Sequence, residues 1–325
     1  MRPKHLLTFL FLALLGLLDA CRQLPENLGN ADRELQFDLC AAALKQPLED
    51  RAYQGLDGWF FFTLDLREAH PLYERTAFFA EFSARLEAQG VTLVLLPVTS
   101  RAVVRPDTLY LGDPLHLNFD PREAEARYND FLAGLRVGGV EVFDVLAAAR
   151  AFDAGGGQTF FRRDLHWRSD GANAVFQGVA AQVKRLESDL PQAAVALSRA
   201  PGEAQHRGQF VNTWTSRTCG YLLPAEPHGV YAVTPTPSGN ASSDVVLVGS
   251  SFSIPPYGFD FLAAALQSPV YNAAVGSGGA KLSLERYLGS AAYRNHKPRV
   301  LVWEFPVYAY GFSPDEQAQL LGLVD

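Results

Sequence analysis

The stretch VVLVGSSFS, residues 245–253, joins four aliphatic residues to a glycine and a serine-rich turn. A short run that is apolar at every position is typical of a strand buried on both faces of a parallel sheet. Other strand candidates lie at 91–96, 140–143, 269–272 and 299–304. Segments with helical spacing separate them. The sequence therefore predicts an α/β fold of three layers, with a mainly parallel sheet and helices on both of its faces.

Helices are expected wherever apolar residues recur at helical spacing and a stop signal follows. We expect them around 35–48, at 77–89, around 128–135, up to residue 152, around 175–186, at about 259–266 and at about 281–293. Residues 55–62 read as a turn that feeds an aromatic strand. Residues 188–243 are rich in Pro, Ser and Ala without a regular period, which predicts a small irregular or β insert. One domain thus covers 51–325.

The first twenty residues are typical of a signal peptide. Arg2 and Lys4 precede an apolar segment at 6–18, which is too short to span a bilayer comfortably. The sequence Leu-Asp-Ala-Cys at 18–21 resembles a bacterial lipoprotein cleavage box, although Asp19 is unusual there. We expect export to the periplasm, with two alternatives left open: a lipid anchor on Cys21, or ordinary cleavage nearby. Residues 21–50 are then a tether and a lead-in helix.

Composition excludes several classes of protein. A hydrophobic content of 48% and a charged fraction of 19% are those of a globular chain of 325 residues. A net charge of −7 argues against nucleic-acid binding. Three cysteines without a C-x-x-C pair argue against structural zinc, and we expect no metal and no cofactor. Besides Cys21, the cysteines are Cys40 and Cys219, which form either a disulfide or two separate buried thiols.

The segment FRRDLHWRSDGA, residues 161–172, places a carboxylate and an imidazole two residues apart. In an extended segment both side chains point to one face, so Asp164 can accept the N–H of His166 and orient its ring. Ser169 or Asp170 can cap the helix that follows. A surface salt bridge or a simple cap is the alternative interpretation of this pair.

A serine on the turn after 245–248 lies at the carboxyl end of a strand, where reactive residues gather in such sheets. We take Ser251 as the nucleophile, His166 as its general base and Asp164 as the orienting group. Ser250 and Ser253 are rivals on composition alone. The oxyanion hole would combine the Ser251 N–H with a glycine amide from the loop at 272–279, where Asn272, Gly276 and Gly278 are candidates. A plain turn is the alternative for that loop.

Six short motifs follow one another along the chain. They are DGWFF (57–61), PVTSR (97–101), FFRRDLHW (160–167), GSSFS (249–253), NAAVG (272–276) and VWEFP (302–306). In this order they resemble the periplasmic alginate O-acetyltransferases of the AlgX and AlgJ type, whose catalytic domain is related to SGNH esterases. The resemblance implies an SGNH hydrolase-like fold, a triad of Ser251, His166 and Asp164, and a Cys40–Cys219 disulfide.

The resemblance also implies a function. The expected reaction is a ping-pong transfer of an acetyl group through an acyl-serine onto hydroxyls of an acidic exopolysaccharide such as alginate. A membrane O-acyltransferase would supply the acetyl donor, and we expect a monomer. Two alternatives remain: an acetyl esterase of the same fold, and a non-catalytic polysaccharide-binding scaffold lipoprotein of an export complex. Gly-Ser-Ser at 249–251 replaces the Gly-Asp-Ser of ordinary SGNH esterases, which argues against a generic lipase-like esterase.

Substrate contacts are harder to assign from sequence. The candidate partners for sugar carboxylates are Arg101, Arg162 and Arg163, with solvated surface arginines as the alternative. The candidate stacking residues are Trp167, Phe252 and Tyr257, with a place in the core as the alternative. The expected ordinary loop or surface histidines are His116, His206, His228 and His296. The chain ends about twenty residues after Glu304, so we expect no carbohydrate-binding module of the AlgX type.

Overall fold

The computed structural model of the protein describes the greater part of the chain. The described residues are 30–43, 52–109, 119–208, 219, 222–234, 242–254, 258–277, 279–308 and 312–325. The expected signal peptide and Cys21 lie outside them. None of the helices formed by these residues has the length and apolar character needed to cross a membrane.

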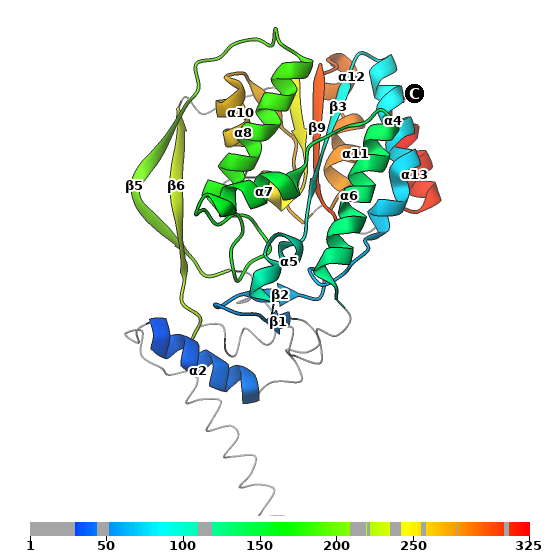
Figure 1. The fold of residues 1–325 in the computed structure, drawn as a ribbon. Helices are drawn as coiled ribbons and strands as arrows, with labels where there is room; N and C mark the ends of the chain where they lie inside the picture. The colour runs from blue at the N-terminus through cyan, green and yellow to red at the C-terminus, as the bar shows by residue number, and fades with distance from the viewer. Residues whose placement is uncertain are drawn as a thin grey trace, which may run out of the picture.

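A five-stranded sheet forms the centre of the fold (Figure 1). Its strands are β3 (Thr92–Val98), β4 (Glu141–Val142), β7 (Val245–Val248), β8 (Val270–Asn272) and β9 (Val300–Pro306). Their order is β4-β3-β9-β7-β8, and every pairing is parallel. The last strand of the chain thus enters the middle of the sheet, where Trp303 lies opposite Leu95 of β3 and Val248 of β7. The predicted parallel sheet is confirmed.

Helices cover both faces of this sheet (Figure 1). One face carries α7 (Val145–Ala154), α8 (Ser169–Leu186) and α10 (Phe259–Leu266). The other carries α4 (Thr76–Ala88), α6 (Pro121–Val137), α11 (Leu282–Leu288), α12 (Ala291–Asn295) and α13 (Pro314–Leu321). The short elements are α5 (Arg101–Val104) and 3-10 turns at Pro71–Arg75, Pro106–Thr108 and Ser251–Ser253. The three predicted layers are therefore present.

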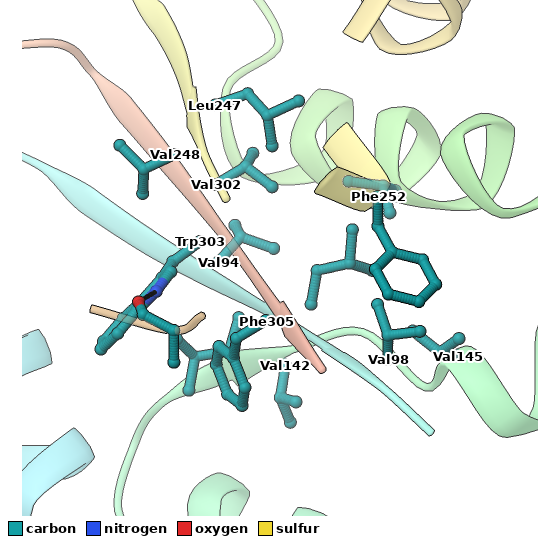
Figure 2. Packing of buried hydrophobic residues seen from close by; sticks show 14 of the residues in the cluster. Val94, Val98, Val142, Val145, Leu247, Val248, Phe252, Val302, Trp303 and Phe305 are labelled. Atoms are coloured by element: carbon teal, nitrogen blue, oxygen red, sulfur yellow. Dashed lines mark hydrogen bonds between the residues drawn. The ribbon is translucent and has the colours of Figure 1, made fainter. Parts of the chain in front are cut away.

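The core is built from strand residues that are apolar on both sides. All seven residues of β9 are buried, and Trp303 in its centre packs against Phe79, Phe82 and Phe312 with ring centres 5.5, 5.6 and 5.9 Å away. The Trp303 Nε1–H donates to the Ala280 carbonyl over 2.8 Å, so the indole is satisfied without water. Figure 2 shows Trp303 with Phe305 of the same strand and with valines of the neighbouring strands, Val94 of β3 and Val248 of β7.

Local signals explain why the helices begin and end where they do. The side chain of Asp120 accepts the Arg122 N–H over 2.8 Å and caps α6, whose first residue is Pro121. The same helix ends before Gly139, which has a φ of 76°. The predicted apolar stripe of α8 packs on the core: Val175, Val179 and Val183 are buried, and Leu186 is half-buried.

Three local expectations were wrong. The helix expected at 281–293 is two helices, because Ser290 accepts the Tyr293 N–H and starts α12 anew. The N-cap of α8 is Arg168, without a side-chain cap, and Asp170 instead accepts hydrogen bonds from Tyr231 and Gly229. The lead-in helix α2 (Asn30–Ala43) begins before the predicted start at residue 35.

The expected insert contains a two-stranded antiparallel ribbon of β5 (Ala196–His206) and β6 (Glu226–Thr234). It stands outside the main sheet, alongside α8 and α10 (Figure 1). A second small pair, β1 (Ala52–Gln54) with β2 (Phe60–Phe62), lies near α2 (Figure 1). A disulfide joins Cys40 of α2 to Cys219 of the insert, with Cα atoms 5.7 Å apart. Of the two alternatives for these cysteines, the disulfide is the one present.

Removing this disulfide should destabilise the fold. The bond closes a loop with a sequence separation of 179, so the double variant Cys40→Ser/Cys219→Ser should lose about 2–4 kcal/mol of unfolding free energy. Urea unfolding followed by tryptophan fluorescence would measure this. Dithiothreitol should lower the wild-type midpoint to that of the variant and leave the variant unchanged. A wild-type midpoint insensitive to reductant would contradict the prediction.

Candidate active site

The turn that follows β7 carries three serines, and a buried glutamate forms hydrogen bonds with two of them. The Glu304 carboxylate on β9 accepts the Ser250 N–H over 2.7 Å and hydrogen bonds from the hydroxyls of Ser250 and Ser253, each 2.8 Å long. Gly249 makes this approach possible, because a Cβ there would lie 2.5 Å from Glu304 Oε2. Two of the three serines are thus bound to the strand beneath the turn.

Ser251 is the serine that remains, and it is partly exposed. Its hydroxyl lies 2.7 Å from Nε2 of His166. The other ring nitrogen of His166 lies 2.6 Å from Oδ1 of Asp164. The structure therefore brings together the three residues that the sequence put forward, in the order serine, imidazole, carboxylate.

The segment that carries His166 and the turn that carries Ser251 are also bound to each other. The Trp167 Nε1–H donates to the Phe252 carbonyl over 3.1 Å, so the residues after His166 and Ser251 are joined directly. Both Trp167 and Phe252 are buried and pack with ring centres 5.1 Å apart. Neither is available to stack on a sugar, so their place in the core is the correct alternative. Tyr257 lies outside the described residues.

A turn, and not the expected extended segment, brings Asp164 to His166. The carboxylate Oδ1 of Asp164 accepts both the backbone N–H and the ring N–H of His166, over 3.0 and 2.6 Å. A side chain that accepts from the backbone two residues on forms an Asx-type turn. The flanking residues Phe160 and Trp167 form an antiparallel bridge that closes the turn.

The second oxygen of Asp164 is also occupied. Nε2 of His206, the last residue of β5, lies 2.8 Å from Oδ2, and the His206 ring stacks on Phe161 at 4.1 Å. Burial raises the pKa of Asp164, but the hydrogen bonds from His166 and His206 outweigh it, so the pKa lies below its usual range. Asp164 is therefore a buried carboxylate that stays ionised.

His206 and His228 are not ordinary surface residues, so that expectation was wrong for both. His228 on β6 is buried, and its Nδ1 lies 3.0 Å from the Ser169 hydroxyl. Burial lowers the pKa of His228, with the charge of His206 contributing. His296 is partly exposed, 3.5 Å from Asp244, in line with the expectation. His116 lies outside the described residues.

Two of the three arginines proposed to bind substrate are buried. The Arg101 guanidinium, 1% exposed, donates to the carbonyls of Phe60 and Asp164, each over 2.8 Å, and to Asp65 over 2.5 Å. It supports the backbone that carries Asp164 and does not face solvent. Arg163 is buried as well and donates to the Pro224 carbonyl. A planar group with several donors is well suited to such a role.

The loop after β8 lies against the serine turn. Asn272 donates from Nδ2 to the Ser253 carbonyl over 3.0 Å, and its Oδ1 accepts the Ala274 N–H over 2.9 Å. The Val275 N–H donates to the Gly249 carbonyl over 2.9 Å. Gly276 comes next, and a Cβ there would approach Ile254 to 3.3 Å. The Asn272 side chain is thus used within the protein, and Gly276 remains beside the turn. Gly278 lies outside the described residues.

Glu304 was quoted in a motif but given no role. A glutamate inside a run of apolar strand residues is the signal that could have identified it, because a strand that is apolar throughout is buried on both faces. Burial raises the pKa of Glu304 to about 7, although the Ser250 N–H and the two serine hydroxyls act against it. The described residues contain no group of three His, Cys, Asp or Glu side chains placed to hold a metal ion.

Comparison with known proteins agrees with this geometry. A family model described as an SGNH hydrolase-like domain, acetyltransferase AlgX, matches residues 52–307. The chain belongs to this family. The resemblance drawn from the six motifs and the SGNH hydrolase-like fold are both confirmed.

Individual relatives point the same way. The Pseudomonas putida protein named "Probable alginate O-acetylase AlgJ" is 32% identical over 273 residues, which are 78% of this chain and 68% of that protein. The solved O-acetyltransferase domain of Pseudomonas putida AlgJ matches with a TM-score of 0.68 and 27% identity, over 84% of this chain and 99% of that one. Pseudomonas aeruginosa AlgX matches with a TM-score of 0.70 and 25% identity, over 84% of this chain and 67% of that one.

The buried carboxyl beneath the serine turn should make stability depend on pH. The pKa of Glu304 is raised from 4.5 to about 7, so the native state holds this proton more tightly than the unfolded state does. Stability from this group is full below pH 4.5 and is lost as pH rises through about 7, with a total on the order of 3 kcal/mol. Urea unfolding at pH 5 and pH 8 should show a smaller difference in Glu304→Gln than in the wild type. Equal differences would rule the assignment out.

Proposed function

We propose that this protein is an O-acetyltransferase that carries an acetyl group on Ser251 and delivers it to hydroxyls of an acidic exopolysaccharide such as alginate. The observation that carries the proposal is the unbroken chain of contacts from the partly exposed Ser251 hydroxyl through His166 to the ionised Asp164. Relatives named as alginate O-acetylases support the choice of acetyl group and of polymer.

The first half-reaction loads the serine. His166 Nε2 takes the Ser251 proton while Oγ attacks the carbonyl carbon of an acetyl ester or thioester. Asp164 holds the ring in the required tautomer and stabilises the imidazolium. The Ser251 N–H and a backbone N–H near Gly276 receive the oxyanion. When the tetrahedral intermediate collapses, the leaving group departs with the proton from His166, and acetyl-Ser251 remains.

The second half-reaction delivers the acetyl group. His166 takes the proton of a sugar hydroxyl, whose oxygen attacks the acetyl carbon of acetyl-Ser251. A second tetrahedral intermediate then releases the Ser251 oxygen, which recovers its proton from His166. The sugar leaves as its acetyl ester, and the enzyme returns to its starting state. None of these steps requires a dissolved cofactor.

The setting of this reaction is also part of the proposal. The signal peptide at 1–20 would direct the chain to the periplasm, and Cys21 would be the point of lipid attachment where the protein is anchored. A membrane O-acyltransferase would then deliver the acetyl donor from the other side of the membrane. The protein would act as a monomer. If water replaces the sugar hydroxyl in the second half-reaction, the same residues perform an esterase reaction.

Replacing the nucleophile should abolish turnover. Ser251→Ala should lower the release of p-nitrophenol from p-nitrophenyl acetate by at least about 10³-fold, because no acyl-enzyme can form. With a mannuronic acid oligomer present, mass spectrometry should detect acetylated sugar made by the wild type only. Ser198→Ala, the same change at an exposed position of β5, serves as control and should leave both readouts unaltered.

The possible outcomes separate the candidate functions. Acetate released at the same rate with and without oligosaccharide, and no acetylated sugar with any acceptor tested, would identify an esterase. Wild-type turnover no greater than that of Ser251→Ala would leave the scaffold function. Either result overturns the proposed transfer.

His206 should act as a positioning residue for Asp164. His206→Ala leaves Oδ2 of a buried carboxylate without its donor, a loss of about 1–3 kcal/mol for such a group. We expect kcat for p-nitrophenyl acetate to fall about tenfold with KM nearly unchanged, because His206 contacts Asp164 and not the reacting atoms. His206→Gln keeps an N–H donor and should recover most of the activity. Equal losses in both variants would show that the ring itself, and not its hydrogen bond, is required.

A further inference from the structure

A cleft of about 680 Å³ opens beside the first turns of α8, and Ser251, His166 and Asp164 do not line it. Four arginines line it together with a single described carboxylate, that of Asp170. They are Arg105, Arg162, Arg168 and Arg199. The whole chain has a net charge of −7, so this concentration of positive charge runs against the average of the protein.

Two of the four arginines form no ion pair within the described part of the chain, although the charge of Arg168 helps to lower the pKa of Asp170. Arg162 donates from Nη1 to the carbonyl of Asp57 over 2.9 Å, and Arg168 from Nη2 to that of Pro227 over 2.6 Å. A carbonyl accepts a hydrogen bond but does not cancel the charge. The buried Nε of Arg168 also has no acceptor among the described residues. Arg162 therefore has a charge available for a ligand, and Arg168 shares the one carboxylate of the cleft with Arg199.

The remaining charged residues of the cleft are paired within the protein. Asp170 accepts the Tyr231 hydroxyl over 2.5 Å and lies 3.5 Å from Arg199. Burial raises the pKa of Asp170, but the Tyr231 and Gly229 hydrogen bonds outweigh it, and the pKa is lowered. Arg105 holds Asp107 at 2.8 Å. An anion that enters the cleft therefore meets a carboxylate whose oxygens already accept hydrogen bonds and which lies close to Arg199.

The cleft continues along α8. A second cavity of about 410 Å³ shares Asn173 and Gln177 with the first and extends to Lys184. These three residues lie on one side of the helix and span about 16 Å along its axis. Arg199 and Leu197 of the ribbon line the opposite wall. We call this combined surface the α8 track. Its length suits an extended chain better than a compact ligand.

We propose that the α8 track binds a segment of a carboxylate-bearing polysaccharide and holds it next to the catalytic segment. Guanidinium groups bind carboxylates through charged, often bidentate hydrogen bonds, and the side-chain amides of Asn173 and Gln177 match sugar hydroxyls. Arg168, which lines the track, is two residues from His166 in the chain, and this short segment links the track to the acetyl-transfer centre. The inference rests on the proposed function only for the choice of polymer.

The test measures binding and not activity. In a Ser251→Ala background, isothermal titration with a mannuronic acid hexamer should show binding that weakens as salt is added. Adding Arg162→Gln and Arg168→Gln should weaken it at least about tenfold. The matched control is Arg122→Gln/Arg127→Gln, which removes the same charge from exposed positions of α6 and should change binding less than about twofold. Thermal unfolding would check that each variant is folded.

Several results would overturn the proposal. These are no hexamer binding, equal weakening in the two double variants, or binding of a neutral cello-oligosaccharide of the same length with the same affinity. Binding to phosphatidylglycerol vesicles that depends on Arg162 and Arg168, without hexamer binding, would assign the track to a lipid surface instead. Hexamer binding through the track without acetyl transfer by the Ser251 enzyme would refute the proposed function alone.

Discussion

The desolvation of Asp164 is the constraint on which the rest of the site depends. This carboxylate is 2% exposed, and burial alone would favour its neutral form, which could not stabilise an imidazolium. It stays ionised because His166 and His206 each donate to one of its oxygens. His206 comes from the ribbon, outside the central sheet. The insert is therefore part of the site, because without it one oxygen of Asp164 would have no donor.

In a second buried carboxyl, that of Glu304, the effect of burial on the pKa outweighs that of the hydrogen bonds. It receives hydrogen bonds from a backbone N–H and two hydroxyls, all of them neutral groups, and its pKa rises to about 7. Asp164 receives its bonds from imidazoles, and its pKa falls. The comparison indicates that the two carboxyls have different roles. In the proposed mechanism Asp164 supplies charge to the reacting groups, whereas Glu304 holds the turn that carries Ser251 without placing a full charge beneath it at lower pH.

The sequence predicted the parallel sheet and strand 245–248 because a short, wholly apolar run before a glycine has few other interpretations. It also predicted that Asp164, His166 and Ser251 meet, from the Asp-x-His pair, the serine at the end of strand 245–248 and the family resemblance. Composition alone left Ser250 and Ser253 as rivals of Ser251, because what separates them is Glu304 on the neighbouring strand β9, which binds the other two serines. His206 was missed because an insert without a period gives no register for its residues.

The arginines show where reasoning from composition fails. Arg101, Arg162 and Arg163 were treated alike, yet Arg101 and Arg163 are buried against backbone carbonyls and only Arg162 reaches the cleft. The difference lies in which carbonyls the fold places around each guanidinium, and no local pattern encodes that. The net charge of −7 likewise describes the whole chain and not any one surface of the fold. Arg105, Arg162, Arg168 and Arg199 come from separate segments, so folding an acidic chain can still gather them on one surface.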